Sequence, residues 1–177
     1  GRARAIFRWV NDEIDEGDGL DTPVSYILEE RMGNRARLLH VMLREAGVPS
    51  ELWLVRTAHA DHTKTQIPSF NVYTKLLVKV GDDWLLPFAR TTPYGALPFD
   101  VRGEKAVRLF PDRAHDLTPG QDRFDAAHSR HLDITVLPSG RSKVRLTETY
   151  RGINAAMMRV GLDSLPEAEL DKAIETA

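Results

Sequence analysis

The chain has 177 residues, enough for one ordinary domain or for one domain and part of a second. Apolar residues make up 42% and charged residues 28%, which is typical of folded globular proteins and not of disordered ones. A formal net charge of -2 argues against a phosphate-tracking surface, so we expect no nucleic-acid partner, and no apolar run approaches the roughly 20 residues of a membrane span.

Three helices are expected near the start of the chain. Residues 3–15 repeat an apolar side chain every fourth position, which is the pattern of an amphipathic helix. Thr22, followed by a proline, predicts the start of a short helix that runs to about Glu30. The strongest pattern covers 33–46, where apolar residues form one stripe and Gly47 ends the helix.

The pattern then changes to that of β-strands. Residues 51–57 form a compact apolar run typical of a central strand, and the polar stretch 58–68 predicts a loop. Two further strands are expected at 70–80 and 84–88, joined by a hairpin-like connection, and one more at 105–110. Helices followed by a mostly antiparallel set of strands indicate the α+β class.

The last third of the chain has a different character. Residues 111–127 are polar and contain prolines, so we expect a linker or a long surface connection. Residues 131–136 and 142–150 alternate around a Pro-Ser-Gly turn, which predicts a β-hairpin, and helices are expected at 151–162 and 166–176.

These patterns divide the chain into a core at 1–110, a connection at 111–127 and a β-hairpin and helix segment at 128–177. A hairpin and two helices bury little apolar surface by themselves, so we expect the last segment to be a truncated second domain. Gly1 stands where a native chain would begin with Met, and we therefore expect the chain to be part of a longer protein.

Three parts of the sequence carry a family resemblance when they are taken in order. They are residues 5–10 (AIFRWV), residues 38–48 (LLHVMLREAGV), and residues 84–88 (WLLPF) with 93–98 (PYGALP). Their order and spacing resemble the transglutaminase-like core of bacterial multidomain proteins, over about residues 3–110. The resemblance implies a papain-type fold, with N-terminal helices packed on a mostly antiparallel sheet, and a β-rich domain that opens with the predicted hairpin.

The resemblance also implies a particular chemistry. In that family a Cys-His-Asp triad carries out acyl transfer or amide hydrolysis. The thiolate lies at the N-terminus of the long helix, where unpaired backbone N–H groups and the helix dipole stabilise it. A histidine from the sheet acts as its base, and an aspartate on the next strand orients the imidazole.

This chain retains none of the three catalytic residues at the matching positions. Counting back from the paired leucines of the long helix puts the thiol position at Met32, whereas a match through Gly33 puts it at Arg35. The histidine position falls on Lys75 and the aspartate position on Leu86. The sequence contains no cysteine at all, so a cysteine nucleophile, a disulfide and a thiolate metal site are excluded without any alignment.

Other side chains offer different chemistry. The His-x-x-His pairs His59/His62 and His128/His131 are possible metal ligands, but without further ligands a solvated loop is the simpler interpretation. The hydroxyls that would have to replace a thiol are Ser25, Ser69, Thr91 and Thr92. None of them lies in a nucleophile-elbow pattern. His40, on the long helix, is interpreted as a surface or half-buried position and not as a base.

Two further groups of residues have a functional and a structural interpretation. Arg31, Arg35 and Arg37 surround the start of the long helix, where an anion can bind, but a solvated basic face is the simpler explanation. The tryptophans are Trp9, Trp53 and Trp84. We expect them to be core anchors, with one of them lining the inherited cleft.

The sequence therefore predicts a catalytically inactive domain that binds a peptide, a protein or a glycan, or that organises the flanking domains of the same chain. The residues expected around the cleft are Gly33, Asn34, Arg35, Lys75 and Trp84. No metal, cofactor or membrane insertion is expected, and the resemblance implies export to the cell envelope or beyond. The alternative is a hydrolase with a relocated site that uses a hydroxyl nucleophile or a metal ion.

Overall fold

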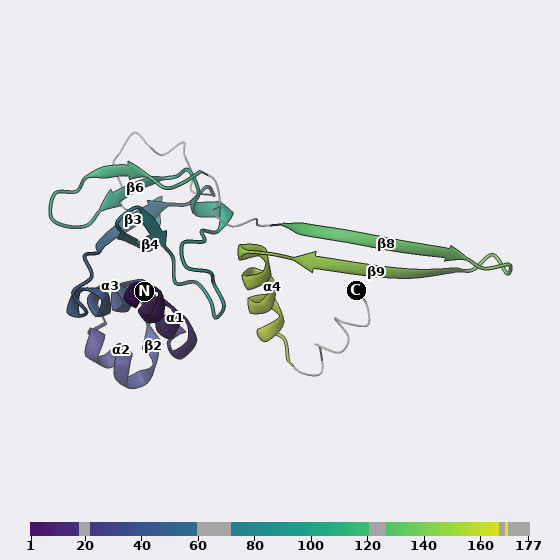
Figure 1. Cartoon of the computed structure of the whole chain (residues 1–177), viewed down its shortest axis with the longest axis horizontal. Helices are drawn as coiled ribbons and strands as arrows, with labels where there is room; N and C mark the ends of the chain where they lie inside the picture. The colour runs from purple at the N-terminus through teal and green to yellow at the C-terminus, as the bar shows by residue number, and fades with distance from the viewer. Residues whose placement is uncertain (18–21, 60–71, 121–126, 167–168, 170–177) are drawn as a thin grey trace. The chain divides into compact units, whose positions relative to one another are not determined.

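The chain folds as two compact units, Gly1–Arg123 and Phe124–Ala177, which are described separately. The computed structural model describes residues 1–17, 22–59, 72–120, 127–166 and 169. Among the described residues, the first unit contains the helices α1, α2 and α3 and a sheet, and the second contains a long hairpin and the helix α4 (Figure 1). The α+β class predicted from the sequence is confirmed.

The helices of the first unit are α1 (Arg2–Glu13), α2 (Val24–Glu30) and α3 (Arg35–Glu45). Asn34 caps α3, because its side-chain oxygen accepts a hydrogen bond from the backbone N–H of Arg37 at 2.9 Å. Gly47 follows the last turn with φ 73°, a conformation that glycine adopts without strain. A two-residue parallel pair, β1 (Asp15–Glu16) with β2 (Met32–Gly33), links the end of α1 to the start of α3.

A five-stranded antiparallel sheet forms the other layer of this unit. Its strands are β3 (Glu51–Arg56), β4 (Tyr73–Val80), β5 (Asp83–Leu85), β6 (Lys105–Arg108) and β7 (His115–Leu117). The spatial order is β5-β4-β3-β6-β7, so β3 is central, as its compact apolar run predicted. A short 3-10 helix, η3 (Phe99–Val101), lies in the connection between β5 and β6.

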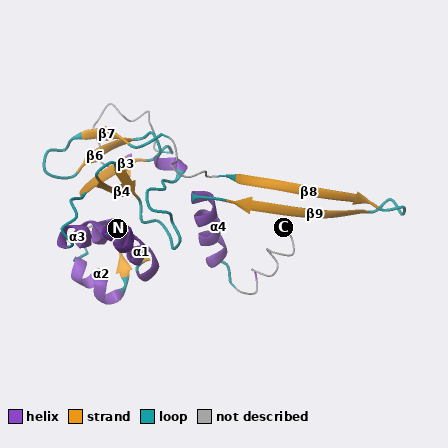
Figure 2. Ribbon diagram, viewed as in Figure 1, coloured by secondary structure: helices purple, strands orange, loops and turns teal. Residues whose placement is uncertain are grey.

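The sheet is buried on both faces, and Figure 2 shows the helices gathered on one of them. On that face, Leu76 and Val78 of β4 pack into a core with residues of α1 and α3 such as Phe7 and Leu43. On the other face, Leu77 packs into a second core. The buried members of this second core are Trp53, Val55, Leu77, Trp84, Leu86, Leu97, Val101 and Ala106. Burial of consecutive residues on β4 is typical of a strand that is covered on both sides.

Two local features of the first unit differ from the expectations. Gly33 was expected inside the long helix, but it belongs to β2 with φ 149°, and a Cβ there would lie 2.6 Å from Cγ1 of Ile27. His115–Leu117, within the expected linker, forms the edge strand β7 because it pairs with β6. Three residues with one apolar side chain are too short and too polar to show a strand pattern in sequence.

The second unit contains the predicted hairpin and one described helix. Strands β8 (His128–Val136) and β9 (Ser142–Tyr150) pair in register from His128↔Tyr150 to Val136↔Ser142. Helix α4 (Ile153–Asp163) follows after Gly152. Most of the helix expected at 166–176 lies outside the described residues.

Within the described part of the chain, none of the helices combines the length and the hydropathy of a membrane span.

Candidate functional site

A surface cleft of about 720 Å³ opens in the first unit, at the end of the sheet where β3 begins and β4 and β6 end. The residues around it come from the end of α3, the α3–β3 connection, these three strands, the β4–β5 turn, and the β6–β7 turn with β7. They are Arg44, Pro49, Ser50, Glu51, Trp53, Lys79, Gly81, Arg108, Ala114, His115 and Asp116. The antiparallel register explains the convergence, because Glu51 lies opposite Lys79 and Trp53 lies opposite Arg108.

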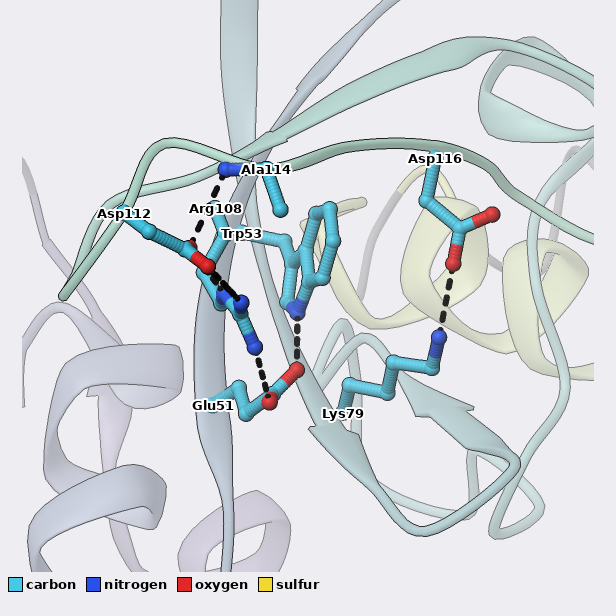
Figure 3. A network of polar contacts seen from close by, with 7 residues as sticks. All are labelled: Glu51, Trp53, Lys79, Arg108, Asp112, Ala114 and Asp116. Carbon is cyan, nitrogen blue, oxygen red and sulfur yellow. Dashed lines mark hydrogen bonds and ion pairs between the residues drawn. The ribbon is translucent and has the colours of Figure 1, made fainter.

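The indole of Trp53 is the centre of a cation–aromatic cluster at this cleft (Figure 3). The guanidinium carbon of Arg108 lies 5.6 Å from the Trp53 ring centroid, and Nζ of Lys79 lies 5.3 Å from it. Lys79 also lies over Trp84 at 4.8 Å, and the two indole rings pack with their centroids 5.1 Å apart. Cations over indole rings are favourable contacts, and they hold both charged side chains close to the sheet.

Carboxylates partner both cations. Glu51 accepts hydrogen bonds from the indole Nε1 of Trp53, at 2.9 Å, and from Arg108, so it bridges the two residues. Arg108 also donates to Asp112, through Nε at 2.9 Å and through Nη2 at 2.6 Å to each carboxylate oxygen, and Lys79 donates to Asp116 at 2.7 Å. In Figure 3, hydrogen bonds thus connect β3 to β6 through Glu51 and Arg108, and β4 to β7 through Lys79 and Asp116.

The electrostatics of the cleft follow from these pairs. The carboxylates are 39–57% exposed and the two cations only 20%, so the negative groups form the outer rim. The hydrogen bonds that Arg108 donates to Asp112 and then to Glu51 raise the pKa of Arg108, and the bond from Arg108 lowers the pKa of Asp112. The hydrogen bond from Lys79 lowers the pKa of Asp116 in the same way. These groups are consequently ionised at neutral pH, and they suit the cleft to binding and orienting a polar ligand.

A serine–histidine pair lies at the same cleft. Oγ of Ser50, which lines the cleft, is 2.9 Å from Nδ1 of His40 on α3. Burial and then the nearby charge of Arg44 lower the pKa of His40, so its imidazole is neutral at pH 7. A neutral imidazole beside a hydroxyl has the composition of a nucleophile–base pair. The same contact also ties the helix to the start of β3, which is a structural role.

Arg35 occupies the first position of α3 and is buried. Its Nε donates to the carbonyl oxygen of Ile14 at 2.6 Å, and its Nη1 donates to the carbonyl oxygen of Phe88 at 2.8 Å. Desolvation lowers the pKa of this guanidinium, whereas the charges of Glu16 and Asp15 raise it. The side chain therefore connects the end of α1, the start of α3 and the segment after β5.

The structure distributes the residues expected around an inherited cleft over both sides of the sheet. Met32, in β2, is exposed, and Gly33 and Asn34 lie beside it at the start of α3. Trp84 and Leu86 are buried in the core on the face away from the helices. Lys75 lies on this face as well, because it alternates with Leu76 along β4 and shares the side of Leu77. Of the expected residues, only Arg35 connects the helix start with the segment after β5.

The three arginines at the start of α3 do not gather around one anion site. Arg31 lies over the Trp9 ring at 5.0 Å, Arg35 is buried, and Arg37 donates to the carbonyl oxygen of Thr22 at 2.5 Å. Each guanidinium thus contacts a different part of the protein.

The remaining candidate ligands and nucleophiles are also separate. No group of three or more His, Cys, Asp or Glu side chains suited to a metal ion occurs among the described residues. His128 and His131 alternate along β8 and so point to opposite faces of the hairpin. The pair His59/His62 and the hydroxyl of Ser69 lie wholly or partly outside the described residues. Thr92 is buried in a turn, where its hydroxyl accepts from the Ala89 N–H, and Ser25 and Thr91 are exposed.

The cleft residues Glu51, Arg108 and Asp116, and Ser50, were not singled out in the sequence, and His40 was considered there without a partner. Glu51 and Arg108 are 57 positions apart, and only the β3–β6 register brings them together. The sequence contained one relevant pattern, because polar side chains lie next to the predicted strands, both before and after the apolar run at 51–57. That pattern does not reveal which strands are neighbours.

Comparisons with known proteins identify no family for this chain. No protein-family model matches it, and no curated protein matches it either. One similar solved structure is a chain from Parabacteroides distasonis described as a "putative protease", with 22% sequence identity and a TM-score of 0.48. The match covers 68% of this chain and 24% of that one, so this chain spans about a quarter of the length of the protein it matches.

Proposed function

We propose that the first unit is a transglutaminase-like, papain-type core that has lost its catalytic triad and now serves as a binding or structural module. The observation that carries the proposal is Arg35. Arg35 is the first residue of α3, which is the position of the thiol when the family is matched through Gly33. Its Nε and Nη1 donate hydrogen bonds to backbone carbonyl oxygens. A buried guanidinium in this place cannot act as a nucleophile.

The cleft beside Trp53 is the site that we assign to binding. It presents carboxylates at its rim and basic side chains from Arg44 and His115, and it lies beside the short edge strand β7. This mixture of charges suits a polar segment of a peptide or protein, or the hydroxyls of a glycan. The exposed carboxyl group of Asp116 also accepts a hydrogen bond from the Leu117 N–H at 2.8 Å. This contact hinders strand addition at β7, because it occupies an edge donor, so side-chain contacts are expected to dominate.

The loss of catalysis is tested by assaying release of ammonia from glutamine-containing peptides and cleavage of amide bonds by the full chain. We expect no turnover from the wild-type chain and none from Arg35→Cys, because the base and its orienting acid are also missing. Turnover by the wild-type chain would refute the inactive assignment. Turnover by Arg35→Cys alone would instead show that the other two roles are filled by residues outside the matched positions.

Binding at the cleft is tested by fluorescence anisotropy with a pool of labelled random hexapeptides and, separately, with peptidoglycan fragments. We expect binding that Arg44→Ala weakens at least threefold, since Arg44 lines the cleft. Arg8→Ala is the matched control, because it removes the same charge from an exposed position of α1. Equal effects of the two substitutions would remove the cleft from the proposal.

A second candidate function rests on the 2.9 Å contact between Ser50 Oγ and His40 Nδ1. It is a hydrolase in which Ser50 is the nucleophile and the neutral His40 is the base. A fluorophosphonate probe distinguishes it from the binding module. Stoichiometric labelling that Ser50→Ala abolishes and Ser25→Ala preserves would favour the hydrolase, whereas the binding module predicts no labelling.

A further inference from the structure

The carboxylates at the rim of the cleft already accept hydrogen bonds from this chain on every oxygen (Figure 3). These carboxylates belong to Glu51, Asp112 and Asp116. Their donors are the side chains of Trp53, Lys79 and Arg108 and the backbone N–H of Leu117. A basic ligand would therefore have to compete with internal donors at each of these groups.

Arg44, a third cation of the cleft, is in a different situation. Among the residues that the structure describes, none provides an acceptor for its guanidinium. Its place in the last turn of α3 has a structural explanation, since cations stabilise the C-terminus of a helix. Arg2 already serves that end, because its Nη1 donates to the carbonyl oxygen of Ala46 at 3.0 Å. An acceptor from a ligand can thus bind Arg44 without displacing a contact within the described part of the chain.

A second donor of the cleft lies on the same side as Arg44. His40 precedes Arg44 by one turn on the same face of α3, and the charge of Arg44 contributes to the lowered pKa of His40. Nδ1 of His40 is 2.9 Å from Oγ of Ser50, which lines the cleft. Arg44 and Ser50 therefore offer a guanidinium and a hydroxyl, which are donors that suit a carboxylate.

The free edge of the sheet offers backbone groups at the same cleft. Ala114 and Thr118 make their backbone hydrogen bonds toward β6, so in this antiparallel pair the backbone groups of His115 point away from β6. Strand β7 is the last of its sheet, and no described residue pairs with that outer side of His115. The N–H of Leu117, the next outward donor, is occupied by Asp116. The edge can therefore pair with one residue of an extended chain but not with a whole strand.

We infer that the cleft recognises an acidic peptide, in which an Asp or Glu side chain binds Arg44 and Ser50 while the peptide backbone pairs with His115. This inference rests on the binding function proposed above and names its ligand. The cleft of about 720 Å³ is large enough for a short segment of chain. The backbone groups of His115 favour a peptide over an acidic glycan, which has no peptide groups to pair with them.

Three pools of labelled hexapeptides test the charge preference by fluorescence anisotropy with the full chain. The pools have random sequences except for one central residue, which is Glu, Gln or Lys, and their ends are acetylated and amidated to remove the terminal charges. We expect the Glu pool to bind at least about threefold more tightly than the Gln pool, and the Lys pool to bind most weakly. The preference for Glu should shrink as the salt concentration rises, because exposed charges are screened.

Two substitutions at the cleft locate the preference. Arg44→Gln should remove most of the difference between the Glu and Gln pools, and Ser50→Ala should reduce it. Arg8→Gln is the matched control, because it removes the same charge from an exposed position of α1 and should leave the difference unchanged. Circular dichroism of each variant confirms that the fold is retained. A preference for Glu that survives Arg44→Gln would overturn the inference.

The same measurements separate failure of this inference from failure of the binding function. Equal affinities for the Glu and Gln pools, both weakened by Arg44→Ala, would overturn the acidic preference and keep the cleft as a binding site. No binding of any pool would remove the binding function and this inference with it. A labelled galacturonate trimer provides the acidic glycan arm. Binding of that trimer as tight as that of the Glu pool would overturn the assignment of a peptide.

Discussion

Arg35 illustrates, at the scale of one residue, how a charge can be buried in this fold. A guanidinium loses hydration when it is buried, and the loss lowers its pKa. Two backbone carbonyls, those of Ile14 and Phe88, accept its hydrogen bonds and replace part of the lost water. Because both carbonyls accept a hydrogen bond from Arg35, its removal should lower the free energy of unfolding by more than the loss of one surface charge would.

Substitution of Arg35 by Met keeps most of the side-chain volume and removes both donors. We expect the free energy of unfolding to fall by about 2–4 kcal/mol, because one buried and one half-buried carbonyl lose their partner. Urea denaturation followed by circular dichroism measures the change. Arg31→Met serves as the control, because Arg31 is exposed and lies over the Trp9 ring, and it should change stability by less than about 1 kcal/mol. Equal losses in the two variants would contradict the role given to Arg35.

Asp116 makes a prediction about pH. Its pKa in the folded chain is below the ordinary value of 3.8 because it accepts a hydrogen bond from Lys79. A carboxyl group with a lowered pKa stabilises the fold above its unfolded pKa, and this contribution disappears as the pH falls through the folded value. We therefore expect the free energy of unfolding to decline below about pH 4 and to decline less steeply in Asp116→Asn. Urea denaturation between pH 7 and pH 2.5 checks this, and identical slopes in both chains would count against the Lys79 contact.

At the scale of elements, α3 shows why boundaries are harder to predict than helices. Its apolar stripe and its C-terminal glycine were recognisable, and both mark the observed helix. Its start was placed two residues early, because Gly33 lies against Ile27 in an extended conformation that only the packing of α2 requires. A glycine that is needed for close approach looks in sequence like any other glycine before a helix.

Gly33→Ala tests this close approach. A Cβ would lie 2.6 Å from Cγ1 of Ile27, and φ 149° is unfavourable for residues other than glycine. We expect a loss of about 2–4 kcal/mol in the free energy of unfolding. Gly120→Ala is the matched control, because no atom lies within 4 Å of its Cβ position and its φ is not in the positive range. Thermal unfolding of both variants decides the question, and a Gly33→Ala chain as stable as the control would refute the packing argument.

At the scale of the whole molecule, the two units differ in what they bury. The first holds both of its layers together with a core on each face of the sheet. In the second, Ile153 and Ala156 of α4 are buried, while the outer hairpin exposes its aliphatic residues. The first unit thus has what a self-sufficient domain requires, and the second does not.

A chain shortened to residues 1–123 is therefore expected to fold alone. Its melting temperature should lie within about 5 °C of that of the first transition of the full chain, because both cores and every strand of the sheet are retained. Differential scanning calorimetry provides the measurement. A shortened chain without a cooperative transition would show that the second unit is needed for the fold of the first.

The sequence by itself determined the α+β class, three N-terminal helices, the central strand β3, the hairpin and the absence of a thiol. These properties depend on local periodicity, on capping residues and on composition, which are all readable along the chain. Only the tertiary structure decided that Arg35 is buried between Ile14 and Phe88, that Glu51 meets Arg108, and that β7 joins the sheet. Such contacts depend on strand order and register between residues far apart in sequence, and periodicity carries no information about which strands are neighbours. The candidate cleft therefore belongs to the tertiary structure, and the absence of cysteine belongs to the sequence.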